Sequence, residues 1–179
     1  MSVVMGLSMQ NQTELLQNAE READSVRLDI VGPEVFPIDP VEVATTLGLR
    51  VFDISIDETI SGALVQTDAE SDPVVLLNRS NSELYQSFTC AHEIGHFVQR
   101  LSSYEPASSY QWIDRRAQLA EPWTDVNEIY ANAFAAALLM PRSLITREYQ
   151  VSRSTVSLAV KFRVPALAMQ HRLINLQLL

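Results

Sequence analysis

Two of the three histidines in this 179-residue chain lie four positions apart, in the stretch CAHEIGHFVQR at 90–100. In a helix, positions i and i+4 lie on the same face, so the imidazoles of His92 and His96 can point at one tetrahedral metal ion. Glu93 lies about 100° further round the helix, where it is poorly placed to bind the metal but can reach a water molecule beside it. The H-E-x-x-H pattern therefore predicts a metal-dependent hydrolytic centre with Glu93 as general base.

A catalytic zinc site has three protein ligands and an open position, so a third ligand is expected from a second helix. Glu128, within TDVNEIYANAFAAALLM, is our first choice, and Asp125 is its competitor. Glu121 and Asp114 are weaker choices because they fall in an expected loop. Asn132 shares the helix face of Glu128 and could hydrogen-bond the outer nitrogen of a ligand histidine. A helix N-terminus also favours an acidic residue without any metal, so the spacing alone does not choose the third ligand.

The elements around these residues indicate an α+β fold, with helices packed on a small sheet. Three short apolar and β-branched runs predict a three-stranded, mostly antiparallel sheet: LRVFDI, ISGALVQ and PVVLLN, between residues 49 and 78. The motif helix follows, opened by a capping box from Ser80 to Glu83. Residues 102–123 are expected to form an irregular loop, and Pro141 ends the helix that carries Glu128. Further helices are predicted at 11–29, 40–47, 143–162 and 165–177.

Gly95 stands in the middle of the motif helix, where glycine costs about 1 kcal/mol relative to alanine. We expect a close neighbour that requires the missing side chain, either another helix or the third metal ligand. Cys90, the only cysteine, excludes an intramolecular disulfide and a multi-cysteine zinc site. It is placed to pack in the core rather than to bind the metal.

The chain divides into three predicted segments: an N-terminal helix and linker (1–35), a core with both motifs (36–141) and a basic helical C-terminal subdomain (142–179). The net charge of −9 argues against binding nucleic acid through the whole surface. No apolar run approaches the roughly 18 residues that span a bilayer, and the N-terminus has no basic residue before its apolar stretch, unlike a secretory signal. We therefore expect a cytoplasmic protein without membrane contact.

The C-terminal segment has the opposite charge to the body of the chain. Residues 1–140 carry 7 basic and 21 acidic side chains, whereas residues 141–179 carry 6 basic and 1 acidic. The segment resembles a helix-turn-helix, and a DNA-binding role predicts phosphate contacts from Arg153, Lys161, Arg163 and Arg172. Its second helix offers few polar groups for reading bases. This favours packing on the acidic body, or docking of an acidic partner, over direct DNA binding.

The two motifs together, FTCAHEIGH followed by NEIYANAFAAALLMP, closely resemble the ImmA/IrrE-type metallopeptidases, a gluzincin-like group. The resemblance covers roughly residues 36–179 and implies a minimal zincin-like core with a helical C-terminal tail. It implies that one zinc or manganese ion is bound by His92, His96 and Glu128, with Glu93 as the general base. It also makes Asn132 and Phe134 motif positions.

The resemblance further implies a cytoplasmic protein of bacteria, phages or mobile elements that cleaves or inactivates a partner helix-turn-helix repressor. The settings of the family include stress responses and toxin–antitoxin-like pairs. The alternative is a non-proteolytic binding module that contacts the repressor or DNA and whose metal site is structural or idle. The intact Glu93 favours the peptidase, because a purely structural site has no use for a general base.

A peptidase of this plan binds its substrate as an added strand at a sheet edge. The strand with Val74, Val75 and Leu76 is our candidate edge because it leads directly into the motif helix, and an interior position for that strand is the alternative. An oxyanion donor is also expected. The candidates for it are Tyr104, Tyr110, Tyr130 and His171.

Overall fold

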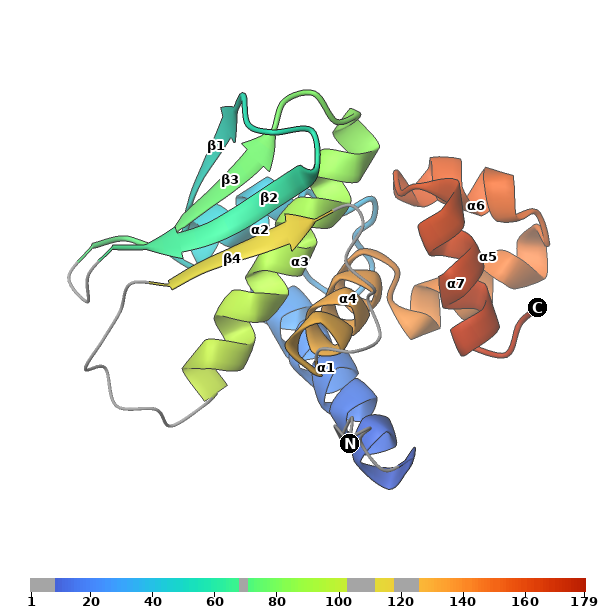
Figure 1. Ribbon diagram of the computed structural model, residues 1–179. Coiled ribbons are helices and arrows are strands. Elements are labelled where there is room, and N and C mark those ends of the chain that lie inside the picture. The colour runs from blue at the N-terminus through green and yellow to red at the C-terminus, as the bar shows by residue number, and fades with distance from the viewer. Residues whose placement is uncertain (1–8, 68–70, 103–111, 118–125) are drawn as a thin grey trace, which may run out of the picture.

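The computed structural model describes residues 9–67, 71–102, 112–117 and 126–179. Its sheet has four strands in the order β1–β3–β2–β4: β1 (Arg50–Ile54), β2 (Ile60–Gln66), β3 (Val74–Asn78) and β4 (Trp112–Ala117). β1 pairs with β3 in parallel, whereas β2 runs antiparallel to both β3 and β4. Helices cover the sheet, so the predicted α+β class and its mostly antiparallel sheet are confirmed (Figure 1).

The fourth strand, β4, lies in the segment that we predicted as an irregular loop. Its sequence, WIDRRA, holds three charged residues, so it lacks the apolar run by which the other strands are recognised. A strand at the edge of a sheet pairs with only one neighbour, and edge strands often carry charged residues, so an apolar run is not required there. The antiparallel ladder from β2 to β4 nevertheless extends from Ile60 to Gln66.

The predicted substrate edge is wrong. Val74 and Val75 of β3 lie opposite β1 on one side, in register with Arg50 and Val51. On the other side, β2 pairs with the same strand, including Leu76. β3 is thus an interior strand, because it is the most apolar of the sheet and gains most from neighbours on both sides. Among the described strands, β1 and β4 form the two edges.

The helices follow in sequence from α1 to α7. They are α1 (Met9–Ile30), α2 (Pro40–Thr46), α3 (Glu83–Ser102), α4 (Val126–Leu139), α5 (Arg142–Val151), α6 (Thr155–Phe162) and α7 (Ala166–Asn175). Asp39 caps α2 by accepting a hydrogen bond from the backbone N–H of Val41 at 2.9 Å. The single helix predicted at 143–162 is two helices, because Ser154 caps a new one by accepting from the N–H of Ser157.

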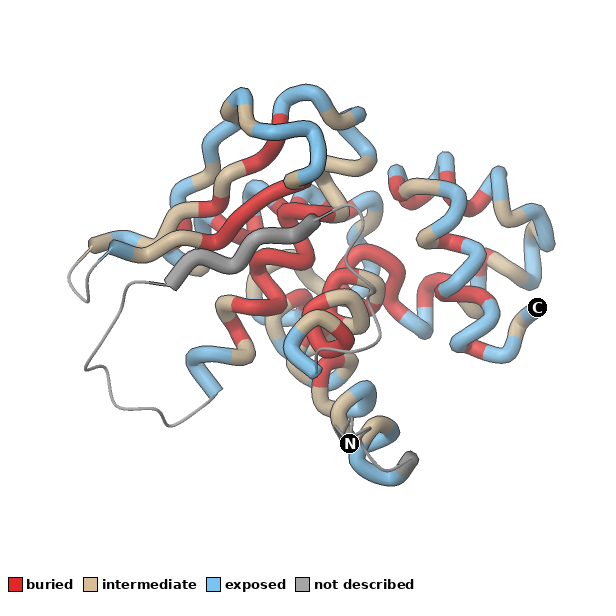
Figure 2. Tube along the Cα trace, viewed as in Figure 1, coloured by how far each residue is buried: buried red, intermediate tan, exposed pale blue. Residues whose placement is uncertain are grey.

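Helix α3 occupies the centre of the molecule, between the sheet and the pair α4 and α1 (Figure 1). Its middle, from Thr89 to His96, is continuously buried. Figure 2 shows the buried segments running along β2, β3, α3 and α4. One hydrophobic cluster joins all regions, with Ala19 of α1, Leu64 of β2 and Met169 of α7 among its members. The division at residues 35 and 141 therefore stays a prediction. Among the described residues, no single helix has the length and apolarity of a membrane span.

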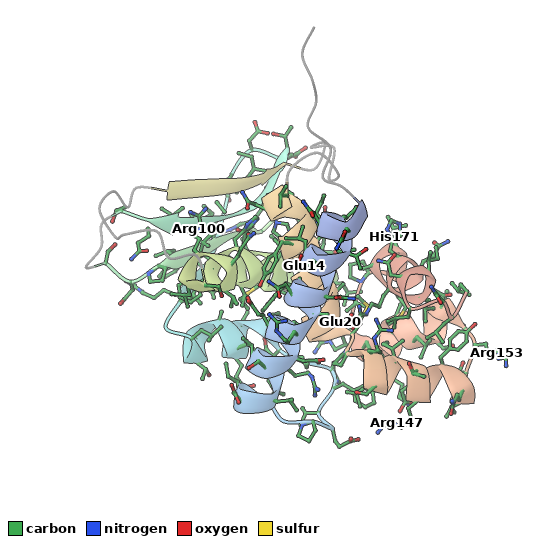
Figure 3. All side chains as sticks on the ribbon, turned by 90° about the horizontal axis from the view of Figure 1, so that it is seen from below. Glu14, Glu20, Arg100, Arg147, Arg153 and His171 are labelled. Atoms are coloured by element: carbon green, nitrogen blue, oxygen red, sulfur yellow. The ribbon has the colours of Figure 1, made fainter. Side chains whose placement is uncertain are left out.

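The basic C-terminal helices dock on the acidic body. Arg172 of α7 is 6% exposed, and its guanidinium lies 2.8 Å from Glu20 Oε1 of α1. The Nε of Arg172 also donates to the carbonyl of Met140, at the end of α4, at 2.9 Å. Arg142 binds the other oxygen of Glu20 at 3.1 Å. Figure 3 shows Glu20 on the side of α1 that faces these helices.

This docking corrects part of the DNA-binding interpretation. Arg172 is buried, so the phosphate contact predicted for it is wrong. Lys161 pairs with Glu148 within the same segment, and Arg163 lies 3.9 Å from Glu83 of α3. Arg153 is exposed at the outer side of the molecule (Figure 3). The structure favours the alternative in which the basic segment packs on the body of its own chain.

We predict that Glu20→Gln lowers the free energy of unfolding by about 3 kcal/mol, because it leaves the buried Arg172 without a countercharge. Burial alone would raise the pKa of Glu20, but hydrogen bonds and charges from Arg142 and Arg172 bring it below its ordinary value. The contribution is therefore present at neutral pH and declines as pH falls below about 4.3.

Denaturant unfolding measures this loss. The matched control is Glu34→Gln, which removes an exposed ion pair with Arg147 and should cost about 0–1 kcal/mol. If the two variants lost equal free energy of unfolding, the pair of Glu20 and Arg172 would not be a stabilising buried contact.

Candidate metal centre

Helix α3 carries His92, Glu93 and His96, all of them buried. As the i, i+4 spacing predicts, the two imidazoles lie on one face of the helix, with their Nε2 atoms 2.9 Å apart. The exposed fractions of His92 and His96 are 0% and 3%. Buried imidazoles require polar partners, so the groups that face them decide what the site can bind.

Glu128, in the first turn of α4, brings a carboxylate to both imidazoles. Its Oε2 lies 3.3 Å from His92 Nε2, and its Oε1 lies 3.1 Å from His96 Nε2. Burial alone would raise the pKa of Glu128, but hydrogen bonds and charges from the two histidines hold it well below its usual range. The competitors Asp125 and Glu121 lie outside the described residues, and the structure describes only the backbone of Asp114.

Asn132, one turn after Glu128 on α4, fixes the orientation of the first imidazole. Its Oδ1 lies 3.1 Å from Nδ1 of His92, and as an acceptor it favours the tautomer with the proton on Nδ1. The Nε2 of His92 then presents a lone pair toward His96 and Glu128. This is the restraint that outer partners usually provide to metal-ligating histidines.

The donor set fits a divalent ion. The three candidate ligand atoms lie within 4.8 Å of one another. Ligand atoms bound to a tetrahedral zinc ion at 2.0–2.1 Å are about 3.3 Å apart, close to the 3.3 Å and 3.1 Å that separate the Glu128 oxygens from the imidazoles. Two imidazole nitrogens and one carboxylate are ligands that zinc accepts. A cation bound between them would neutralise the repulsion between the Glu128 carboxylate and the imidazole lone pairs that face it.

Two glycines allow the backbones around this centre to approach closely. A Cβ on Gly95 would lie 3.0 Å from Ala131 Cα and 3.1 Å from Phe134 Cβ, so the neighbour expected for this glycine is helix α4. A Cβ on Gly62, in β2, would lie 2.5 Å from Thr89 Cγ2 and 2.9 Å from the carbonyl oxygen of Leu76. The Gly62 distances are shorter than real Cβ contacts, and those at Gly95 are tighter than most of them, so α3 packs closely against both β2 and α4.

Glu93 faces the sheet side of α3. Its carboxylate is fully buried, and Oε1 lies 3.6 Å from the position that a Cβ on Gly62 would take. Glu93 follows His92 directly in the helix, and its carboxylate approaches β2 at Gly62. Gly62 and Thr89 were missed in the sequence, although a glycine inside an apolar strand can indicate close backbone approach.

Neither of the two proposed oxyanion donors that the structure describes, Tyr130 and His171, is brought to the centre. Tyr130 donates its hydroxyl hydrogen to Glu22 of α1, and burial together with Glu22 raises the pKa of Tyr130. His171 is exposed on α7, at the outer side of the molecule in Figure 3. Tyr104 and Tyr110 lie outside the described residues. Cys90 is buried in the hydrophobic core, as expected, and burial raises the pKa of its thiol.

Comparison with known protein families matches residues 44–174 to Peptidase_M78, described as the IrrE N-terminal-like domain. A curated relative is an uncharacterized immunity region protein 2 of Bacillus phage phi105. It is 24% identical over 128 residues, which cover 72% of this chain and 75% of the relative.

A transcriptional regulator of Mycobacterium tuberculosis is similar in structure, with a TM-score of 0.55 at 18% identity. The similarity covers 89% of this chain and 46% of the regulator, so the chain spans about half the length of that protein. At this identity the likeness shows a shared fold. The shared fold thus occurs there within a longer chain.

Asn132→Leu should weaken metal binding by about 10–100-fold, because His92 would lose the acceptor that orients it. Asn132→Asp keeps an oxygen at the same position and should retain most of the affinity. Competition titration with a chromophoric zinc chelator measures both variants. If Asn132→Leu binds zinc as tightly as the unaltered chain, the tautomer assigned to His92 is incorrect.

Proposed function

The chain belongs to the Peptidase_M78 family, the IrrE N-terminal-like domain, and on that basis we propose that it is a zinc-dependent endopeptidase whose substrate is a helix-turn-helix repressor. The observation that carries the proposal is the convergence of His92, His96 and Glu128 from two helices. Glu93 follows His92 on the same helix and is buried with it. The two histidines and Glu128 would be the ligands, and Glu93 the general base.

A divalent ion bound there would acidify a water molecule and polarise the scissile carbonyl. Zinc suits the two imidazoles and one carboxylate, and manganese is the second choice because it prefers oxygen ligands. The Asn132 oxygen holds the His92 ring so that Nε2 stays directed at the centre. Glu128, partly exposed at 24%, lies on the side from which a substrate can enter.

Glu93 is placed to move the protons of the reaction. Its carboxylate would accept a proton from the attacking water and then deliver it to the amine of the leaving peptide. A buried carboxylate is poorly hydrated, so it interacts mainly with the groups enclosed beside it rather than with bulk water. Gly62 lets Glu93 reach the sheet side of the centre, where an extended substrate would lie.

The strand that would receive the substrate is β4. It is the edge next to β2, the strand that Glu93 adjoins, and Arg116 of β4 pairs with Gly62. The other edge, β1, is separated from β2 by β3. A peptide added along β4 would gain main-chain hydrogen bonds and would run past the metal centre. This assignment replaces the edge first predicted at Val74, Val75 and Leu76.

The proposed substrate rests on the setting of the relatives. The phage relative is an immunity region protein, and the solved relative is a transcriptional regulator. Cleavage or inactivation of a repressor in the cytoplasm would switch on the genes that it controls, in a mobile element, a stress response or a toxin–antitoxin pair. The non-proteolytic alternative, a module that only binds the repressor, differs in having no turnover.

The chain should bind one equivalent of zinc, and binding should raise its melting temperature because the ligands are preformed in the folded state. His96→Ala should weaken zinc binding by at least about 100-fold, since it leaves two ligands. The control is His171→Ala, which removes an exposed histidine from α7. Elemental analysis and calorimetric titration measure the effect. An equal loss of zinc affinity in both variants would contradict the assignment of His96 as a metal ligand.

Glu93→Gln should reduce repressor cleavage by at least about 1,000-fold while zinc binding is retained, because the amide cannot accept the proton. The matched control is Glu83→Gln on the same helix, where the side chain is 91% exposed. The assay follows cleavage of the repressor encoded beside the gene by mass spectrometry. Undiminished cleavage by Glu93→Gln would refute the mechanism. Repressor binding without any cleavage by the unaltered chain would identify the binding module instead.

A further inference from the structure

Thr89 has a buried hydroxyl that its surroundings do not explain. The side chain lies in the middle of α3 and is 0% exposed. Its Oγ1 has no hydrogen-bond partner among the residues that the structure describes. A buried hydroxyl without a partner destabilises the folded state, and valine would fill the same space without that penalty. The hydroxyl therefore calls for a function other than packing.

Thr89 lies beneath the reacting groups of the centre. At 3.6 residues per turn, Thr89 and Glu93 are only about 40° apart around the helix. Side chains of a helix lean toward its N-terminus, so the Glu93 carboxylate leans back over the turn that holds Thr89. Around the same helix, His96 and His92 lie about 20° and 60° from Thr89, on the side away from Glu93.

Both side chains meet the same point of β2. A Cβ on Gly62 would lie 2.5 Å from Thr89 Cγ2 and 3.6 Å from Glu93 Oε1. The missing side chain of Gly62 thus leaves room for both the methyl group of Thr89 and the carboxylate of Glu93 at one point of β2. Neither group is reached by bulk solvent.

We propose that Thr89 is a positioning residue for Glu93. Its hydroxyl donates a hydrogen bond to the carboxylate oxygen on the β2 side, after a small rotation of the side chains, while the other oxygen engages the water that is deprotonated. Fixing one oxygen restricts the carboxylate to the orientation in which it can accept that proton. The coupling of the two side chains stands on its own, whereas its effect on turnover rests on the proposed function.

A conservative pair of variants separates this role from packing. Thr89→Val keeps the shape and removes the hydroxyl, whereas Thr89→Ser keeps the hydroxyl and removes the methyl group. In the zinc-loaded enzyme, Thr89→Val should lower kcat about tenfold with KM and zinc affinity unchanged, because only the orientation of Glu93 is affected. Thr89→Ser should stay within about threefold of the unaltered kcat. An active enzyme whose kcat is unchanged by Thr89→Val overturns the proposal.

A double-mutant cycle tests the coupling without any turnover. Thr89→Val is combined with Glu93→Met, which removes both carboxylate oxygens, and the unfolding equilibrium is measured for the four zinc-loaded proteins. We expect the effect of Thr89→Val on the unfolding constant to differ by at least about fivefold between the proteins with and without Glu93→Met. Additive effects overturn the proposal. If the unaltered chain cleaves no repressor, the peptidase assignment fails, and this cycle alone then tests whether Thr89 and Glu93 are coupled. The two failures are therefore distinguishable.

Discussion

The candidate centre depends on how closely α3 and α4 approach each other at Gly95. The two imidazoles come from α3 and the carboxylate from α4, so the distance between the helix backbones sets the distance between ligands. Contacts of 3.0–3.2 Å around an added Cβ are tighter than most real Cβ contacts, so a larger residue at Gly95 would require α4 to shift by a few tenths of an ångström. Gly62 imposes the same requirement on the other side of α3, where β2 approaches. The positions of the candidate ligands thus depend first on how closely the backbones of α3, α4 and β2 approach one another.

This tight packing carries an energetic burden, because polar groups occupy the centre of the molecule. His92, Glu93 and Thr89 are fully buried on the helix that otherwise contributes Cys90, Ala91 and Ile94 to the core. Burying such groups is unfavourable unless they are hydrogen-bonded or bound to an ion. The apolar cluster shared by the sheet and the helices offsets part of the cost. Asn132 and Glu128 reduce it further by providing partners for the imidazoles.

Sequence reasoning succeeded where the information is local. The spacing of His92 and His96 follows from helix geometry alone. The apolar period of α4 put Glu128 and Asn132 on one helix face, whereas only the family resemblance decided between Glu128 and Asp125. Most helices and three strands were likewise predicted from periodicity and capping signals. A glycine in the middle of a predicted helix indicates that another element approaches closely, and at Gly95 that element is α4.

The errors concern properties that only tertiary structure determines. Strand order is not encoded in any single strand, so β3 was placed at an edge when it lies between β1 and β2. β4 has too few apolar residues to be recognised before β2 supplies its partner. Arg172 was counted with surface cations because its partner, Glu20, is far away in the sequence. Thr89 looks like an ordinary helix residue until Gly62 is placed against it.

The ion pair between Glu20 and Arg172 joins residues that are 152 positions apart. On the ribosome, α1 emerges among the first elements and α7 among the last. Helix α4, which carries Glu128, packs on α1 and receives the Arg172 hydrogen bond at its end. The contacts that hold this helix are therefore completed only after α7 has left the exit tunnel. The order of synthesis would thus delay completion of the candidate metal centre until the C-terminal helices have been made.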